Sequence, residues 1–181
     1  MKTLPRFIKR RLLASLQVSP VVFLNGARQS GKSTLVQNNL EAIGTKEDPA
    51  TYISFDRPTQ MASAASAPEA FLRNYKGNLI IDEVQLVPGL FRNLKVVVDE
   101  LRLADNAGAN GRYLLTGSAN ILALPQLSDS LVGRMTVLTL YPFCTAEVSQ
   151  GKGNGLEKLL NRDFTSITDR GLSISQAIKL A

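Results

Sequence analysis

The sequence predicts an α/β protein, a three-layer α/β/α sandwich in which a parallel sheet lies between two layers of helices. Short apolar runs that suit buried strands alternate along the chain with longer segments of helical periodicity. This alternation is typical of parallel strands joined by helical crossovers. The length of 181 residues and the hydrophobic content of 44% allow one domain with a sizeable core.

Five apolar runs are the expected strands. The first, residues 21–25 with the sequence VVFLN, is apolar throughout, which is typical of a parallel strand covered by helices on both faces. The other expected strands lie at residues 51–55, 112–120 and 135–143, and at the start of residues 78–85.

Three longer segments carry helical patterns. Residues 31–40 follow the first strand, and residues 59–75 are rich in alanine, with a break expected at Pro68. In residues 90–103 the apolar positions recur at 90, 91, 94, 97, 98 and 101, which is one face of an amphipathic helix.

Residues 26–33, GARQSGKS, follow the first strand and fit the pattern G-x-x-x-x-G-K-[ST]. In such a phosphate-binding loop, or P-loop, glycines let backbone N–H groups surround an anion at the start of a helix. Lys32 is expected to reach the outer phosphates of a nucleotide, and the Ser33 hydroxyl to hold Mg²⁺. The alternative is an ordinary strand–turn–helix connection that uses glycine. The predicted nucleotide-binding residues are Gly26, Ala27, Arg28, Gln29, Ser30, Gly31, Lys32, Ser33 and Thr34.

Polar residues end two further strands. Ligands of open parallel sheets lie beyond the carboxyl ends of the strands, so these residues are expected beside the P-loop. Asp82 suits a direct or indirect hold on the same Mg²⁺, and Glu83 is placed to orient and deprotonate a water molecule. The alternative is a strand end with two solvated acids. Thr116 and Ser118 either contact the γ-phosphate or the water, or merely begin a turn.

Two arginines leave alternatives open. Arg134 is expected at the start of the fifth strand, away from the strand ends where the chemistry is placed. It either supplies charge to the γ-phosphate, in cis or from a neighbouring subunit, or pairs with a surface carboxylate. Arg28, inside the loop, either reaches phosphate or points outward to a partner.

The composition excludes several kinds of chemistry. The chain has no histidine and one cysteine, Cys144, which rules out histidine-based triads, the usual zinc sites and an internal disulfide framework. A single cysteine fits a reducing compartment, so we expect a cytoplasmic protein. No apolar run approaches the roughly 18 residues of a membrane span.

Positive charge is concentrated at the N-terminus. The net charge is +6, and the first forty residues carry seven basic side chains and no acidic one. In residues 1–16 the apolar side chains suit one helical face, and we favour a helix that packs on the core with a solvated basic side. A targeting segment and a contact with nucleic acid or another acidic partner are the alternatives. The basic residues of this face are Lys2, Arg6, Lys9, Arg10 and Arg11.

Five stretches occur along the chain in a recognisable order: LNGARQSGKSTLV, SFDRPTQMASAASAPEAFL, LIIDEVQLVPGLFRNLKVVVDE, RYLLTGSAN and LSDSLVGRMTVLTLYPFCTAEV. In order and spacing they resemble the ATPase domain of uncharacterised prokaryotic AAA-type ATP-binding proteins that carry a C-terminal domain of unknown function. The resemblance covers about residues 1–150. It implies an AAA+-like P-loop NTPase sandwich with the strand order 5-1-4-3-2.

The resemblance also implies roles for single residues. Residues 26–33 correspond to the Walker A motif and residues 79–83 to the Walker B motif. Ala27 and Ser33 stand where the family usually has proline and threonine, and neither change removes phosphate binding. The implied roles are phosphate binding by Lys32, Mg²⁺ binding by Ser33 and Asp82, a base at Glu83, a sensor at Thr116 or Ser118, and a Gly-Arg motif of unsettled role at Arg134.

The expected organisation is one AAA-type ATPase domain followed by a short remainder. We expect residues 1–150 to form the domain, residues 151–155 (GKGNG) to form a linker, and residues 156–181 to begin a truncated C-terminal region. Members of the resembled family continue well beyond the position of Ala181.

The first functional hypothesis is a Mg²⁺-dependent ATPase that binds ATP and ADP and acts on an unknown protein effector, with weak turnover in a shortened chain. The second is a nucleotide-binding switch or interaction module that hardly turns over and contacts a partner, including nucleic acid. A kinase is less favoured, because no arginine-rich lid follows the fourth strand. A GTPase is less favoured still, since the chain lacks an Asn-Lys-x-Asp element. The resemblance makes a homo-oligomer an expected assembly.

Overall fold

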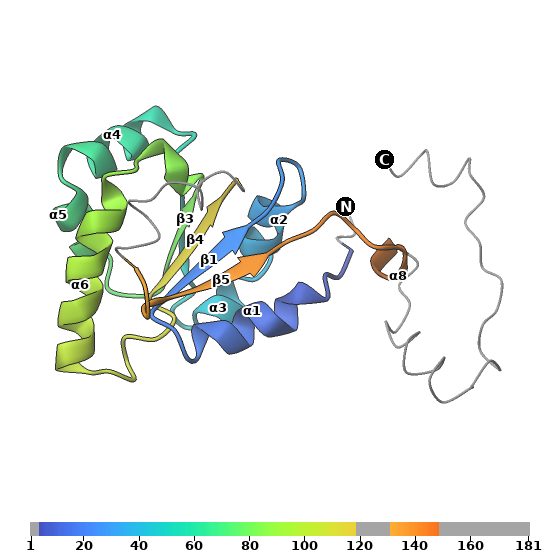
Figure 1. Ribbon diagram of the computed structural model, residues 1–181, viewed down its shortest axis with the longest axis horizontal. Helices are drawn as coiled ribbons and strands as arrows, with labels where there is room; N and C mark the ends of the chain where they lie inside the picture. Colours follow the sequence, from blue (N-terminus) through green and yellow to red (C-terminus); the bar gives the residue numbers. More distant parts are fainter. Residues whose placement is uncertain (1–3, 119–130, 149–181) are drawn as a thin grey trace.

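The computed structural model describes residues 4–118 and 131–148. Within these residues five parallel strands form a sheet in the order β2-β3-β4-β1-β5 (Figure 1). The strands are β1 Val21–Asn25, β2 Thr51–Ser54, β3 Leu79–Asp82, β4 Tyr113–Gly117 and β5 Met135–Thr139. The sheet confirms the predicted α/β fold class and the predicted strand order, read from the opposite edge.

Successive residues of the central strands face two separate hydrophobic cores. In β1, Val21 and Phe23 belong to one core, while Val22 and Leu24 belong to the other. This alternation explains why the strand is apolar throughout, since helices cover both faces (Figure 1). The helices of the first face are α4 Pro58–Ser66, α5 Pro68–Arg73 and α6 Leu90–Ala104. Those of the second face are α1 Ile8–Leu16, α2 Lys32–Gln37 and α3 Leu40–Ile43.

Helix α1 packs on the second core through its apolar side. Leu12 and Leu16 are buried, while Arg10 and Arg11 are exposed. Arg6 departs from the expected pattern, because it precedes the helix and its side chain is buried. The sequence cannot separate it from its neighbours, since its partners lie far away along the chain.

Two predicted helices are interrupted, each for a local reason. The segment predicted at residues 31–40 divides into α2 and α3, and the Asn39 side chain donates a 2.7 Å hydrogen bond to the Leu35 carbonyl where α2 ends. Asparagine side chains compete in this way with helical hydrogen bonds. The break predicted at Pro68 is present, since Ala67 has an extended φ of −144° between α4 and α5.

The chain after β5 leads to the short helix α8, Thr145–Val148. Strand β5 ends at Thr139, earlier than the predicted residue 143, although the Leu140 N–H still donates to the Asn25 carbonyl at 2.7 Å. The predicted linker at residues 151–155 and the predicted C-terminal region at residues 156–181 lie outside the described residues. In the described part of the chain, no helix has both the length and the apolar character that a bilayer crossing requires.

A substitution in α1 tests whether this helix belongs to the folded core. Leu12 is 1% exposed, so Leu12→Ala should lower the free energy of unfolding by about 2–5 kcal/mol. Leu103 is 88% exposed, and Leu103→Ala should change it by less than about 0.5 kcal/mol. Denaturant unfolding of both variants measures the difference. Equal stability of the two variants would show that α1 does not pack as described.

Candidate functional site

The predicted P-loop connects β1 to α2 and depends on two glycines. Gly31 has a φ of +91° immediately before α2, a left-handed conformation that favours glycine. Gly26 approaches the backbone of the neighbouring segment so closely that a Cβ atom there would overlap the Leu140 carbonyl oxygen. These glycines let the loop curl back over the end of β1.

Lys32 lies buried at the start of α2. Its Nζ donates hydrogen bonds to the carbonyl oxygens of Gly26, at 3.0 Å, and Ala27, at 2.9 Å. No carboxylate within residues 4–118 and 131–148 forms an ion pair with it. A desolvated cation that is held only by carbonyl groups favours an anionic ligand, because burial without an opposite charge is costly.

The other predicted loop residues differ in exposure. Ala27, Arg28 and Gln29 are exposed, and Thr34 is exposed on the first turn of α2. Ser30 is buried, and Ser33 is half-buried beside Lys32. Both interpretations of Arg28 therefore remain predictions.

Asp82 is a buried carboxylate that joins three adjacent strands. It ends β3, and its Oδ2 accepts a 2.6 Å hydrogen bond from the Tyr52 hydroxyl of β2. Its Oδ1 accepts a hydrogen bond from the Thr116 hydroxyl of β4. The parallel register thus brings Asp82 and Thr116 together, as the sequence predicts, although 34 positions separate them.

Glu83 adopts a backbone conformation that is unusual for its residue type. Its φ of 55° and ψ of 43° are left-handed, at the junction between β3 and the 3₁₀ helix η1, Val84–Leu86. Such a conformation costs a non-glycine residue about 1–2 kcal/mol. The Gln85 amide donates to the Glu83 carboxylate, and the Glu83 N–H donates to the Thr116 hydroxyl at 3.4 Å. The strained residue is therefore held on both its side chain and its backbone.

Ser118 and Arg134 stand apart from these contacts. Ser118 is half-buried and follows β4 directly. Arg134 lies just before β5, at the opposite end of the strands, where it forms two hydrogen bonds of 2.5 and 3.0 Å with Asp99 of α6. Hydrogen bonding from Arg134 lowers the pKa of the Asp99 carboxyl. The structure does not bring Arg134 to the P-loop of its own chain.

Oxygen ligands for a hard cation meet beside the P-loop. The phenol of Tyr52, which bonds to Asp82, also interacts with the side chains of Ser33 and Gln37. In the described segments no group of three or more His, Cys, Asp and Glu side chains is arranged to hold a metal ion. One carboxylate with one hydroxyl fits Mg²⁺, because this ion keeps several waters and is usually completed by substrate phosphates.

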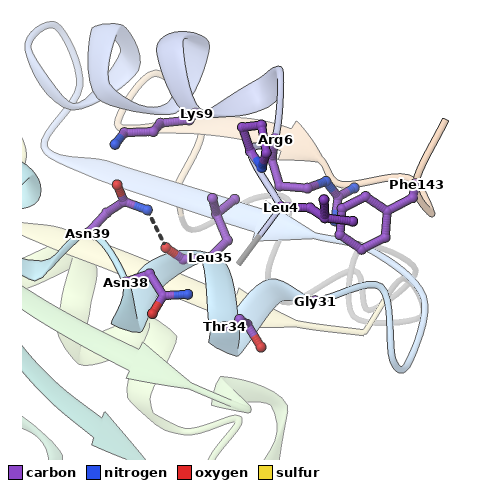
Figure 2. A pocket seen from close by; sticks show the side chains of 10 residues that line it. Leu4, Arg6, Lys9, Gly31, Thr34, Leu35, Asn38, Asn39 and Phe143 are labelled. Atoms are coloured by element: carbon purple, nitrogen blue, oxygen red, sulfur yellow. Dashed lines mark hydrogen bonds between the residues drawn. The ribbon is translucent and has the colours of Figure 1, made fainter. Parts of the chain in front are cut away.

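A pocket of about 330 Å³ lies between the segment that leads into α1 and helix α2. Figure 2 shows Leu4, Arg6 and Phe143 on one side of it and the first turns of α2, with Thr34 and Leu35, on the other. This size is in the range of small-ligand pockets. Because Gly31 of the P-loop also lines it, the pocket is continuous with the predicted phosphate site.

Three buried side-chain atoms at this edge have no hydrogen-bond partner among the described residues. They are Asn25 Oδ1 before the loop, Ser30 Oγ within it, and Gln85 Oε1 next to Glu83. Buried polar atoms are normally satisfied by protein, water or ligand. The edge is therefore suited to a polar ligand with bound water.

The comparisons with known proteins agree with this geometry. A family model described as "AAA domain" matches residues 18–149. The chain belongs to this family. Its AAA-type P-loop fold supports nucleotide binding, as the resemblance of the sequence implies.

The curated relatives that match the chain are themselves uncharacterized proteins. One from Mycobacterium tuberculosis and one from Mycobacterium bovis are each 32% identical to it over 146 residues. The match covers 81% of this chain and 30% of each relative. The chain thus spans about a third of their length, and the activity of a whole relative is not assigned to it.

Solved structures of AAA proteins share the fold at low sequence identity. AMPPCP-bound DnaA from Aquifex aeolicus has a TM-score of 0.51 and 17% identity, over 74% of this chain and 44% of DnaA. The AAA domain of FIGL-1 in complex with ADP has a TM-score of 0.52 and 15% identity, over 81% of this chain and 56% of that one. These two AMPPCP and ADP complexes are matched in fold alone.

Sequence reasoning missed three residues of the site: Tyr52, Gln85 and Arg6. Tyr52 lies in an apolar run where an aromatic residue is unremarkable, and only the neighbouring strand supplies its partner Asp82. Gln85 lies two positions after Glu83, so its proximity to the two acids was the available signal. Arg6 lies in a stretch of basic residues that look alike.

The contact between Tyr52 and Asp82 predicts a change of stability with alkaline pH. Burial, together with the hydrogen bond to Asp82, raises the pKa of Tyr52 from 10.0 to about 12. Because the folded-state pKa is the higher one, the stabilisation is complete below about pH 10 and is lost as the pH rises toward 12. Tyr52→Phe should lower the free energy of unfolding by about 1–3 kcal/mol at neutral pH, and less at high pH.

Denaturant unfolding of the protein and of Tyr52→Phe across this pH range measures the effect. Tyr141→Phe is the matched control, because Tyr141 is 71% exposed. A difference between the protein and Tyr52→Phe that stays constant with pH would contradict the assignment.

Proposed function

We propose that this chain is a Mg²⁺-dependent ATPase domain whose hydrolysis serves an effector outside the described residues. One observation carries the proposal: the buried Lys32, which has no carboxylate partner among the described residues, lies at the same sheet edge as the cluster of Asp82, Glu83 and Thr116. The first feature suits phosphate, and the second suits a metal ion and an attacking water.

In the proposed reaction Lys32 binds the outer phosphates in place of its present carbonyl partners. Ser33 and Asp82 would hold Mg²⁺, and this ion would supply positive charge to the phosphates. Glu83 orients and deprotonates the attacking water, since its carboxylate follows directly after Asp82. Thr116 positions both acids, through the Asp82 carboxylate and the Glu83 N–H. Ser118 is proposed as a second sensor of the γ-phosphate, and only its position directly after β4 supports this role.

The pocket beside the P-loop supports a nucleoside triphosphate as the substrate. It continues the predicted phosphate site at Gly31, and the apolar Leu4, Leu35 and Phe143 line it together with the cationic Arg6 and Lys9. The apolar part of this lining suits a flat base, and its cations suit an anionic phosphate group. ATP and its product ADP are therefore the proposed ligands of residues 26–34.

A nucleotide-dependent switch with little turnover is the second candidate. The observation that favours it is the hydrogen bond from Gln85 to the Glu83 carboxylate, because it occupies one oxygen of the proposed base. Binding without hydrolysis would then be the output of the site.

Two substitutions separate binding from hydrolysis. Lys32→Ala should weaken ATP binding by about 10–100-fold, because a charge-assisted contact with phosphate is removed. Glu83→Gln should retain ATP binding and lower turnover by about 10²–10⁴-fold, because a general base is lost. Calorimetric titration with ATP and Mg²⁺, with phosphate release measured alongside, gives both quantities.

Lys46→Ala and Glu47→Gln are matched controls, since both residues are exposed on the connection between α3 and β2. Unchanged ATP affinity in Lys32→Ala would overturn the site. ATP binding without turnover in the parent protein and in Glu83→Gln would favour the switch over the ATPase.

The partners of this protein and its cellular location are further proposals. A protein effector and a homo-oligomer are proposed from the family resemblance, and a cytoplasmic location is proposed from the single cysteine. A contact with nucleic acid would use Lys9, Arg10 and Arg11, which are exposed on α1. It would not use Arg6, whose side chain is buried.

The position of Arg134 predicts the effect of Arg134→Gln on ATP binding, stability and turnover. Because Arg134 pairs with Asp99 away from the P-loop, Arg134→Gln should leave ATP affinity within about twofold and stability within about 1 kcal/mol. Turnover should fall only if Arg134 contacts the nucleotide that is bound to a neighbouring subunit. Turnover measured across protein concentrations tests this, and a concentration-independent loss would contradict it.

A further inference from the structure

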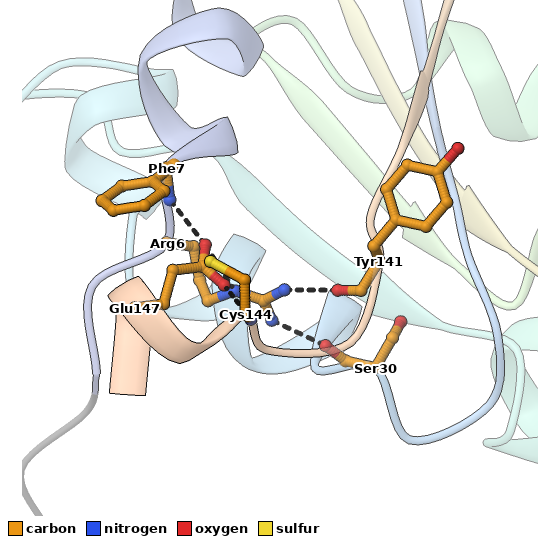
Figure 3. A network of polar contacts seen from close by, with 6 residues as sticks. All are labelled: Arg6, Phe7, Ser30, Tyr141, Cys144 and Glu147. Atoms are coloured by element: carbon orange, nitrogen blue, oxygen red, sulfur yellow. Dashed lines mark hydrogen bonds and ion pairs between the residues drawn. The ribbon is translucent and has the colours of Figure 1, made fainter. Parts of the chain in front are cut away.

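The side chain of Arg6 lies where three distant segments of the chain meet. Its Nη1 donates to the Ser30 carbonyl of the P-loop at 2.7 Å, and its Nη2 donates to the Tyr141 carbonyl after β5 at 2.5 Å. Its Nε forms an ion pair of 3.2 Å with Glu147 of α8 (Figure 3). The guanidinium also lies 4.0 Å from the centre of the Phe143 ring.

The Arg6–Glu147 pair is buried and well satisfied. The two side chains are 6% and 7% exposed. Glu147 also accepts hydrogen bonds from the N–H groups of Phe7, at 2.8 Å, and Cys144, at 3.2 Å. Burial alone would raise the pKa of Glu147, but these hydrogen bonds and the charge of Arg6 outweigh it, so the pKa lies below its usual value. Removing one partner would leave a buried charge uncompensated.

The contact with Ser30 bears directly on the phosphate site. In a planar trans peptide the carbonyl and the N–H point in opposite directions. Because Arg6 binds the Ser30 carbonyl, the N–H of Gly31 in the same peptide points away from Arg6. Backbone N–H groups of such a loop are the ones that bind phosphate in a P-loop.

We propose that Arg6 is a positioning residue of the nucleotide site, which orients the Ser30–Gly31 peptide for phosphate and, through Glu147, couples nucleotide binding to the docking of α8. The proposal rests on the proposed nucleotide function. Coupling of this kind is reciprocal, so nucleotide should stabilise the docking of α8, and docked α8 should strengthen nucleotide binding.

The proposal predicts different effects for substitutions of Arg6 and of Glu147. Arg6→Gln removes the contact with the loop and the contact with α8 together. Glu147→Gln leaves the Ser30 and Tyr141 contacts of Arg6 in place, keeps an oxygen that accepts from Arg6, and removes the negative charge that attaches α8 to it. Arg10→Gln is the matched control, because Arg10 is an exposed arginine of the neighbouring helix.

The experiment measures ATP affinity and the hydrogen exchange of residues 144–148, with and without saturating ATP and Mg²⁺, in the full chain. In the parent protein and in Arg10→Gln, ATP should slow exchange in this segment. Arg6→Gln should weaken ATP binding by about 5–150-fold and abolish the slowing. Glu147→Gln should also abolish the slowing, with a smaller loss of affinity.

Several results would overturn the proposal. One is a folded Arg6→Gln protein with ATP affinity within twofold of the parent, and another is exchange at residues 144–148 that ignores ATP in the parent. If Arg6→Gln does not fold, Arg6→Lys and Glu147→Gln decide the question by the same readouts. A merely structural role would lower thermal stability in the variants while leaving the response of α8 to ATP intact. Failure of the parent to bind ATP would instead refute the proposed function.

Discussion

The parallel order of the sheet is the constraint on which the whole site depends. Because β1 lies between β4 and β5, and β3 lies next to β4, the carboxyl ends of β1, β3 and β4 open on one edge. Strand ends in a parallel sheet cannot be moved singly, since each strand is fixed by hydrogen bonds to its neighbours. The P-loop, the two acids and Thr116 therefore meet without any local sequence signal that joins them. A slip of one position in β3 would move Asp82 to the other face.

At this edge of the sheet, Asp82 connects the polar side chains of three adjacent strands. Its two oxygens accept hydrogen bonds from hydroxyl groups on the strands to either side, which gives each oxygen of this buried carboxylate a partner. Glu83 follows in a left-handed conformation that costs energy, and the contacts from Thr116 and Gln85 hold it there. Strain of this kind persists where surrounding contacts determine it, and it is found most often at functional sites.

A second polar network of a different kind contacts the P-loop at the Ser30 carbonyl. There the buried guanidinium of Arg6 joins the loop to the chain that follows β5. The Ser30 carbonyl of the loop is thus held by an arginine that also pairs with Glu147 of α8 and lines the pocket beside Gly31.

The sequence by itself determined the fold class, the strand order implied by the family resemblance, and the position of the P-loop and the Asp82–Glu83 pair. These features follow from local patterns, because periodicity, glycine spacing and strand-end acids are contained in short segments of chain. Only the tertiary structure decided that Tyr52 supports Asp82, that Gln85 holds Glu83, that Arg134 pairs with Asp99, and that Arg6 turns inward to Ser30 and Glu147. The physical reason is that most of these partners lie tens of residues apart, and 141 positions separate Arg6 from Glu147. Which basic side chain is buried depends on the carbonyl groups and carboxylates that folding brings to it.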